Sequence, residues 1–109
     1  MHILLYEDEH FIRRALAEHL SSQAHEVSEV STGAECIAFL SHTLPDLILL
    51  NGHEIADKIR ALKTEIPMII MSKPGDKLPA MSKHEHILQK PYELADVSAL
   101  IQAKFGQLG

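Results

Sequence analysis

A stretch in the middle of the chain, Pro45-Asp46-Leu47-Ile48-Leu49-Leu50-Asn51, constrains the fold more than any other feature. Its residues 47–50 are all apolar, which is typical of a parallel strand that helices cover on both faces. Pro45 marks the start of this strand, and Asn51-Gly52 marks its end. In open α/β sheets ligands bind beyond the carboxyl ends of the strands, so residue 51 stands where a reactive side chain is expected. The side chain there is an amide.

Further strands and helices alternate along the chain. Strands are predicted over residues 3–6, 26–30, 68–71 and 87–89, and helices over residues 10–21, from the capping-box spacing Thr32-Gly33-Ala34-Glu35 onward, over residues 54–63 and from Tyr92 to Gly106. This alternation predicts one α/β domain over residues 1–109, with parallel strands joined by right-handed crossovers.

The helical patterns also predict which side chains face the core. These are Phe11, Ile12, Ala15, Leu16 and Leu20 in the first helix, Cys36, Ile37, Phe39 and Leu40 in the second, Ile55, Ile59 and Leu62 in the third, and Leu94, Val97, Leu100, Ile101 and Phe105 in the last. Between residues 73 and 86 the pattern weakens, because Pro74, Gly75 and Pro79 disfavour a helix interior. At most a turn or two is expected there, over residues 80–83.

Composition excludes several classes of function. The net charge of −5 argues against direct binding of nucleic acid, which needs a basic surface. No apolar run approaches the roughly 20 residues that span a bilayer, and the chain starts without a secretory signal, so we expect a cytoplasmic protein without membrane contact. The single cysteine, Cys36, lies in a helical pattern and is predicted to be a buried, reduced thiol without a catalytic role.

Polar residues at the strand ends carry a resemblance to a known family. The first strand runs into Glu7-Asp8-Glu9, the fourth ends at Ser72, and the fifth ends at Lys90-Pro91. Two acids, the central strand, a hydroxyl and Lys-Pro, in this order, resemble the receiver domain of two-component response regulators along the whole chain. The resemblance implies a flavodoxin-like, doubly wound, five-stranded parallel sheet, here with a shortened or irregular fourth helix.

The same resemblance implies a role for each of these residues. Glu7 and Asp8 match the acids that hold Mg²⁺, Ser72 matches the hydroxyl, and Lys90, followed by Pro91 through a cis peptide bond, matches the lysine that neutralises phosphoryl oxygens. Asn51 stands in the place of the phosphoacceptor aspartate. An amide does not form a stable acyl phosphate as a carboxylate does, so ordinary phosphotransfer is excluded at this residue.

We therefore interpret the chain as a non-enzymatic pseudo-receiver that binds other proteins independently of phosphorylation. Its expected partners are signalling proteins, namely a histidine kinase, an output domain or another regulator, with a homodimer as a further alternative. The expected surface comprises the last helix, the fifth strand and the preceding segment, in which Leu78 and Met81 either contact the partner or fill the gap left by a shortened helix. Mg²⁺ is expected to bind weakly at most, because Asn51 removes one carboxylate. Ile87 replaces the aromatic switch residue of the family, which predicts a broken or altered relay from Ser72.

Other interpretations of the same residues stay open. Lys90 can pair structurally with Glu7 and Asp8, and Ser72 can simply hydrogen-bond its own turn. A divergent receiver would still bind phosphoryl groups or metal through His53 or Asp57, and His53 with Glu7 and Asp8 would suit Zn²⁺ or Ni²⁺, unless His53 faces solvent. His84-Glu85-His86 is interpreted as surface. A small-molecule ligand in the same crevice is the third alternative, and no Gly-rich phosphate fingerprint supports a dinucleotide.

Overall fold

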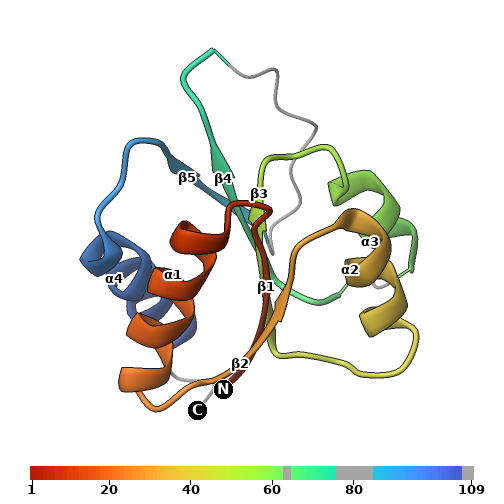
Figure 1. Cartoon of the computed structure of the whole chain (residues 1–109), viewed down its shortest axis with the longest axis horizontal. Coiled ribbons are helices and arrows are strands. Elements are labelled where there is room, and N and C mark those ends of the chain that lie inside the picture. Colours follow the sequence, from red (N-terminus) through yellow and green to blue (C-terminus); the bar gives the residue numbers. More distant parts are fainter. Residues whose placement is uncertain (63–64, 76–84, 107–109) are drawn as a thin grey trace.

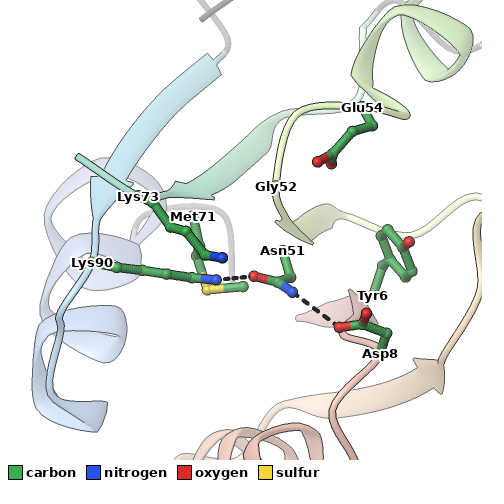
Figure 2. A pocket seen from close by; sticks show the side chains of 8 residues that line it. All are labelled: Tyr6, Asp8, Asn51, Gly52, Glu54, Met71, Lys73 and Lys90. Atoms are coloured by element: carbon green, nitrogen blue, oxygen red, sulfur yellow. Dashed lines mark hydrogen bonds between the residues drawn. The ribbon is translucent and has the colours of Figure 1, made fainter. Parts of the chain in front are cut away.

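The computed structural model describes residues 1–62, 65–75 and 85–106, and they form one parallel sheet with helices on both faces (Figure 1). The elements follow in the order β1 (His2–Tyr6), α1 (His10–Ser22), β2 (Glu26–Val30), α2 (Gly33–Leu40), β3 (Leu47–Asn51), α3 (Ala56–Leu62), β4 (Met68–Ser72), β5 (Glu85–Gln89) and α4 (Leu94–Phe105). The strand order is β2-β1-β3-β4-β5 with parallel pairing throughout. Parallel pairing brings the carboxyl ends of the strands to one edge, where Asn51 and Lys90 lie side by side (Figure 2). The predicted doubly wound, flavodoxin-like sheet is confirmed.

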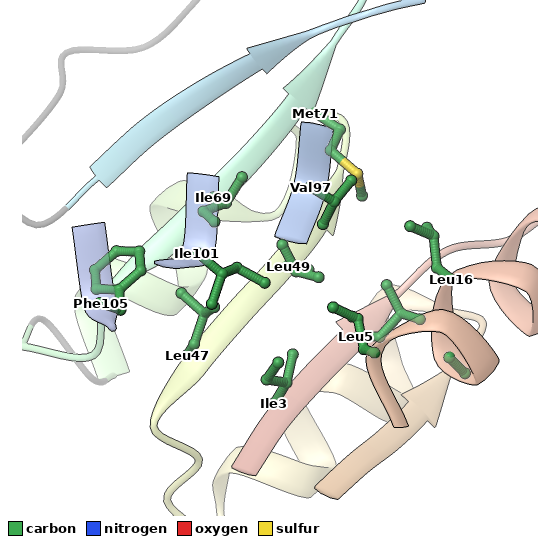
Figure 3. Packing of buried hydrophobic residues seen from close by; sticks show 12 residues of the cluster. Ile3, Leu5, Leu16, Leu47, Leu49, Ile69, Met71, Val97, Ile101 and Phe105 are labelled. Carbon is green, nitrogen blue, oxygen red and sulfur yellow. The ribbon is translucent and has the colours of Figure 1, made fainter. Parts of the chain in front are cut away.

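The continuous apolar pattern of β3 reflects burial on both faces of the sheet. Leu47 and Leu49 pack with α1 and α4 on one face (Figure 3), whereas Ile48 and Leu50 pack with α2 and α3 on the other. All four side chains are fully buried. At about 25 cal/mol per Å² of apolar surface, such complete burial stabilises the strand by roughly 2 kcal/mol for each side chain. β3 is therefore the centre of both cores.

The face of α1 that meets the sheet differs from the predicted one. Leu16 and Leu20 are buried as predicted, but Phe11 is 78% exposed and Ile12 is 46% exposed. Arg13 takes the half-buried position in the first turn, because its guanidinium donates to the Glu7 carbonyl oxygen at 3.0 Å and lies 3.4 Å from Glu29 Oε1. The prediction that Phe11, Ile12 and Ala15 face the core is wrong, since polar contacts with the end of β1 fix the rotation of the helix.

The second helix begins where its sequence signature places it. Thr32 Oγ1 accepts a hydrogen bond from the Glu35 backbone N–H at 3.1 Å, and Glu35 accepts one from the Thr32 N–H at 3.1 Å. This reciprocal pair satisfies two backbone donors that a helix start leaves unpaired. Cys36, one residue later, is a buried free thiol, and its burial raises its pKa to about 11. The prediction of a buried, reduced cysteine is confirmed, and a thiol with this pKa is a poor nucleophile.

The third helix is shorter than predicted. It starts at Ala56, so Glu54 and Ile55 belong to the loop after β3, and Leu62 at its end is 51% exposed. Arg60 on this helix forms an ion pair with both carboxylate oxygens of Glu85, whose side chain is 2% exposed. This pair ties α3 to the amino end of β5, so the prediction that Glu85 is a surface residue is wrong.

Several predictions fall on residues that the structure does not describe. The irregular fourth helix, Leu78, Met81, His84 and the predicted end of the third helix at residue 63 lie outside the described residues. Among the described helices, none is both long and apolar enough to cross a membrane.

Candidate functional site

The carboxyl edge of the sheet holds a polar hollow of about 390 Å³ around Asn51. Its walls come from the ends of β1, β3, β4 and β5 and from the loops that follow them. The lining residues are Tyr6, Asp8, Asn51, Gly52, Glu54, Met71, Lys73 and Lys90 (Figure 2). The structure thus brings together Asp8, Asn51 and Lys90, which are far apart in the sequence.

Asn51 links a cation on one side to an anion on the other. Lys90 Nζ donates a hydrogen bond to Asn51 Oδ1, and Asn51 Nδ2 donates one to Asp8 Oδ1 at 3.2 Å. A carboxylate could accept from Lys90 in the same way, but it has no proton for Asp8. An amide is therefore the group that satisfies both neighbours without metal, whereas two carboxylates at this separation would repel each other.

Lys90 makes its direct contact with this amide. The sequence also allows it to pair with Glu7 and Asp8, but among the described residues its side-chain hydrogen bond goes to Asn51, and Lys90 acts on Glu7 as a nearby positive charge. The main chain supports this position, since Lys90 N donates to the Ser72 carbonyl oxygen at 2.7 Å. The Lys90-Pro91 peptide bond is cis, as the resemblance implied.

Glu7 is buried and does not line the hollow. It is 2% exposed, and its carboxylate accepts a hydrogen bond from the Glu9 backbone N–H at 3.3 Å. Burial raises the pKa of the Glu7 carboxyl, and this effect exceeds the lowering by the Glu9 hydrogen bond and by Lys90. Tyr92 is a near neighbour, because the charge of Glu7 adds to the burial that raises the pKa of Tyr92. Glu7 and Asp8 are neighbours in the sequence, but Glu7 is buried and Asp8 lines the hollow, so their carboxylates have different surroundings.

Ser72 is buried at the end of β4, at 3% exposure, and it does not line the hollow. Its neighbours in sequence, Met71 and Lys73, do so. The Met71 carbonyl oxygen accepts a hydrogen bond from the Gly52 N–H at 2.8 Å, which fixes the turn after Asn51. Two lysines, Lys73 and Lys90, therefore stand on the β4 and β5 side of the amide.

His53 and Asp57 do not join this site. His53 is half-buried rather than facing solvent, and its Nδ1 is buried without a hydrogen-bond partner among the described residues. Asp57 lies on α3, where its carboxylate accepts from Arg60 Nη1 at 2.6 Å. Asp57 does not line the hollow, and its carboxylate is held by Arg60, which also binds Glu85.

The positions of these side chains show whether they could hold a divalent metal ion. In the part of the chain that the structure describes, no group of three or more His, Cys, Asp or Glu side chains is placed to hold a metal ion. This result overturns the hypothetical Zn²⁺ or Ni²⁺ site of His53 with Glu7 and Asp8. It also does not fit a strong Mg²⁺ site, because Glu7 is buried and Asp8 already accepts from the Asn51 amide.

Sequence analysis did not predict five of the lining residues as part of the site, and three of these have polar side chains, namely Tyr6, Glu54 and Lys73. Tyr6 and Lys73 had a signal, since each lies at or directly after the end of a predicted strand. Glu54 had none, because its position fits the start of the predicted third helix. The left-handed Gly52, with φ of +90°, turns the chain so that Glu54 folds back over the site.

Comparisons with known proteins agree on one family. The family model described as "response regulator receiver domain" matches residues 3–102 of the chain. The transcriptional regulatory protein AfsQ1 of Streptomyces coelicolor is 31% identical over 83 residues, which cover 70% of this chain and 36% of that protein. The chain thus spans about a third of this relative's length.

Solved structures share the fold. The signal receiver domain of a signal transduction histidine kinase from Syntrophus aciditrophicus superposes with a TM-score of 0.83 at 21% identity, covering 98% of this chain and 91% of that one. The receiver domain of a Francisella response regulator gives a TM-score of 0.82 at 13% identity, covering 99% and 98%. NtrX from Brucella abortus gives 0.80 at 23% identity, with 97% of this chain matched to 26% of that one.

Proposed function

The chain belongs to the response regulator receiver domain family of two-component systems, and on that premise we propose that it is a pseudo-receiver that signals through protein binding without aspartyl phosphorylation. The observation that carries this proposal is the hydrogen-bonded chain from Lys90 through Asn51 to Asp8. It occupies the position at which a phosphoryl group would be accepted. A neutral amide also lacks the carboxylate oxygen that would attack phosphorus.

The lost charge has a second consequence for the metal. Without a carboxylate at residue 51, the acids that match the metal ligands of the family are Glu7 and Asp8, and Glu7 is almost fully buried. We expect these two residues to bind Mg²⁺ weakly or not at all, since affinity for a hard cation depends on the number of charged ligands. No step of the proposed function uses the metal.

The loop after β3 supports the same conclusion. Only residues 52–55 separate Asn51 from α3, and the Gly52 turn is held by the Met71 carbonyl oxygen. A short, hydrogen-bonded loop has little freedom to rearrange around an incoming phosphoryl group. Ile87 on β5 is half-buried and aliphatic, so it has no aromatic ring that could rotate with Ser72.

We propose that the binding surface comprises α4, β5 and the segment before β5. β5 is an edge strand of the sheet, and Leu94 at the start of α4 is 37% exposed. A histidine kinase, an output domain or another regulator is the expected partner, with self-association as the alternative. The rival function, a receiver that accepts phosphate through His53 or Asp57, is disfavoured because neither side chain lines the hollow.

Intact-mass spectrometry tests the loss of phosphotransfer. The wild-type protein and the Asn51→Asp variant are incubated with Mg²⁺ and a small phosphodonor such as acetyl phosphate. We expect no phosphoryl adduct on the wild type, while an adduct on the variant would show that the remaining scaffold is competent. A phosphoryl adduct on the wild type would overturn the proposal, and its loss in His53→Gln or Asp57→Asn would identify the rival acceptor.

A further inference from the structure

A second hollow adjoins the site, and the function proposed above does not use it. It lies between α2 and α3 and has a volume of about 640 Å³. We call it the α2–α3 groove, and its lining residues are Tyr6, Gly33, Ala34, Ile37, Ala38, Glu54, Ile55 and Lys58. Tyr6 and Glu54 line both hollows, so the groove opens into the polar site at these two side chains.

Small residues on α2 keep the groove open. Ala34 and Ala38 are exposed and lie one turn apart, so their methyl groups form one wall. Gly33 allows the loop before α3 to approach, since a Cβ there would lie 3.0 Å from Ile55 Cδ1. The volume of the groove falls in the range of small-molecule sites, and its apolar walls offer a place for a hydrocarbon chain.

The junction of the two hollows is acidic. Asp8 and Glu54 both lie near the Tyr6 hydroxyl, and their charges add to the burial that raises the pKa of Tyr6. Figure 2 shows Asp8, Tyr6 and Glu54 on one side of Asn51, with Lys73 and Lys90 on the other. The Lys90 ammonium is hydrogen-bonded to Asn51 Oδ1, whereas Glu54 reaches the junction by the Gly52 turn. A cationic group therefore matches the Tyr6 side of the site.

From this geometry we propose that the α2–α3 groove binds a small organic cation, a primary ammonium with an apolar tail. The ammonium lies at the junction, where Glu54 and Asp8 accept its hydrogen bonds and the Tyr6 ring offers a π face. The tail lies along Ala34, Ala38 and Ile55. Lys58 is exposed and also lines the groove. An anionic ligand would place its head group at Lys58 instead of at the junction, so ligands of opposite charge distinguish the two binding modes.

Amide chemical-shift titrations with hexylamine, hexanol and hexanoate test this site. We expect saturable shifts at Tyr6, Gly33 and Glu54 with hexylamine, and weaker or absent shifts with hexanol and hexanoate. Equal responses to all three compounds would show non-specific apolar contact and overturn the proposal. A stronger response to hexanoate would overturn it as well, by assigning the groove to an anion at Lys58.

Two matched pairs of variants test the head and the tail separately. Glu54→Gln should weaken hexylamine binding about fivefold, as expected for one solvent-accessible ion pair, while Glu65→Gln, an exposed acid outside the groove, should not. Ala38→Leu should fill the groove and abolish the shifts, while Ala103→Leu, an exposed position on α4, should leave them unchanged. Unchanged binding in both Glu54→Gln and Ala38→Leu would refute the site, and none of these results depends on whether the protein is phosphorylated.

Discussion

Replacing Glu7 by glutamine should stabilise the protein, although it changes a residue of the site. Glu7 is 2% exposed, and its carboxylate is near Lys90 without a hydrogen bond from it among the described residues. Burial raises the pKa of this carboxyl, so the environment disfavours its charge on balance. Glutamine keeps the shape and the acceptor for the Glu9 N–H while it removes the buried charge.

The expected effect at pH 7 is about 1 kcal/mol of added free energy of unfolding, which is a common size for a single stabilising substitution. For a domain of this size it corresponds to about 4 °C in Tm. The effect should depend on pH with a definite sign. The Glu7 carboxyl has a higher pKa in the folded state than its ordinary value of 4.5, so it binds its proton more tightly when the protein is folded. The stability of the wild type therefore falls as the pH rises from the ordinary pKa through the raised pKa of the folded state.

Urea denaturation of both proteins between pH 4 and pH 8 measures this difference. We expect the two proteins to be equally stable at the acidic end and the variant to be more stable at pH 7. Asp8→Asn, at an exposed position next in sequence, is the control and should change stability little. A Glu7→Gln variant that is less stable at pH 7 would mean that attraction to Lys90 outweighs burial, and it would refute this account of the site.

Two further predictions concern the scaffold. Arg60→Ala removes the guanidinium that donates to both oxygens of the buried Glu85, so it should lower the free energy of unfolding by about 3 kcal/mol. Adding Glu85→Gln to the same protein should recover part of the loss. An Arg60→Ala variant with wild-type stability in urea would contradict the assigned ion pair. Thr32→Ala removes one half of the capping box of α2 and should cost about 1 kcal/mol, while Thr32→Ser should cost little, and equal losses in both would indicate that the hydroxyl is not the stabilising group.

The fold could be predicted because its signals are local and agree with one another. The apolar run of β3 and the capping box at Thr32 each specify an element without reference to the rest of the chain, and the structure places both as predicted. Parallel strands then place Asp8, Asn51 and Lys90 at one edge. The position of these three site residues could therefore be predicted from the same topology.

Other features depend on contacts that the sequence does not display. The rotation of α1 is fixed by Arg13 and its acceptor on Glu7, which left Phe11 exposed against the apolar pattern. Glu54 reaches the site because Gly52 adopts a positive φ, and a sequence pattern does not report that angle. The buried pair of Arg60 and Glu85 joins residues 25 positions apart, so no local pattern could reveal it.

The central claim is that Asn51 has replaced phosphorylation control by a fixed, hydrogen-bonded site. Its most direct test is an amide chemical-shift titration with Mg²⁺ and then beryllofluoride, a phosphoryl mimic, on the wild type and on Asn51→Asp. We predict no specific shifts at Asp8, Lys90 or α4 in the wild type, and shifts that spread from the site in the variant if the scaffold alone is intact. Saturable, Mg²⁺-dependent shifts in the wild type that reach α4 would contradict the claim, because they would show a working receiver site without the aspartate.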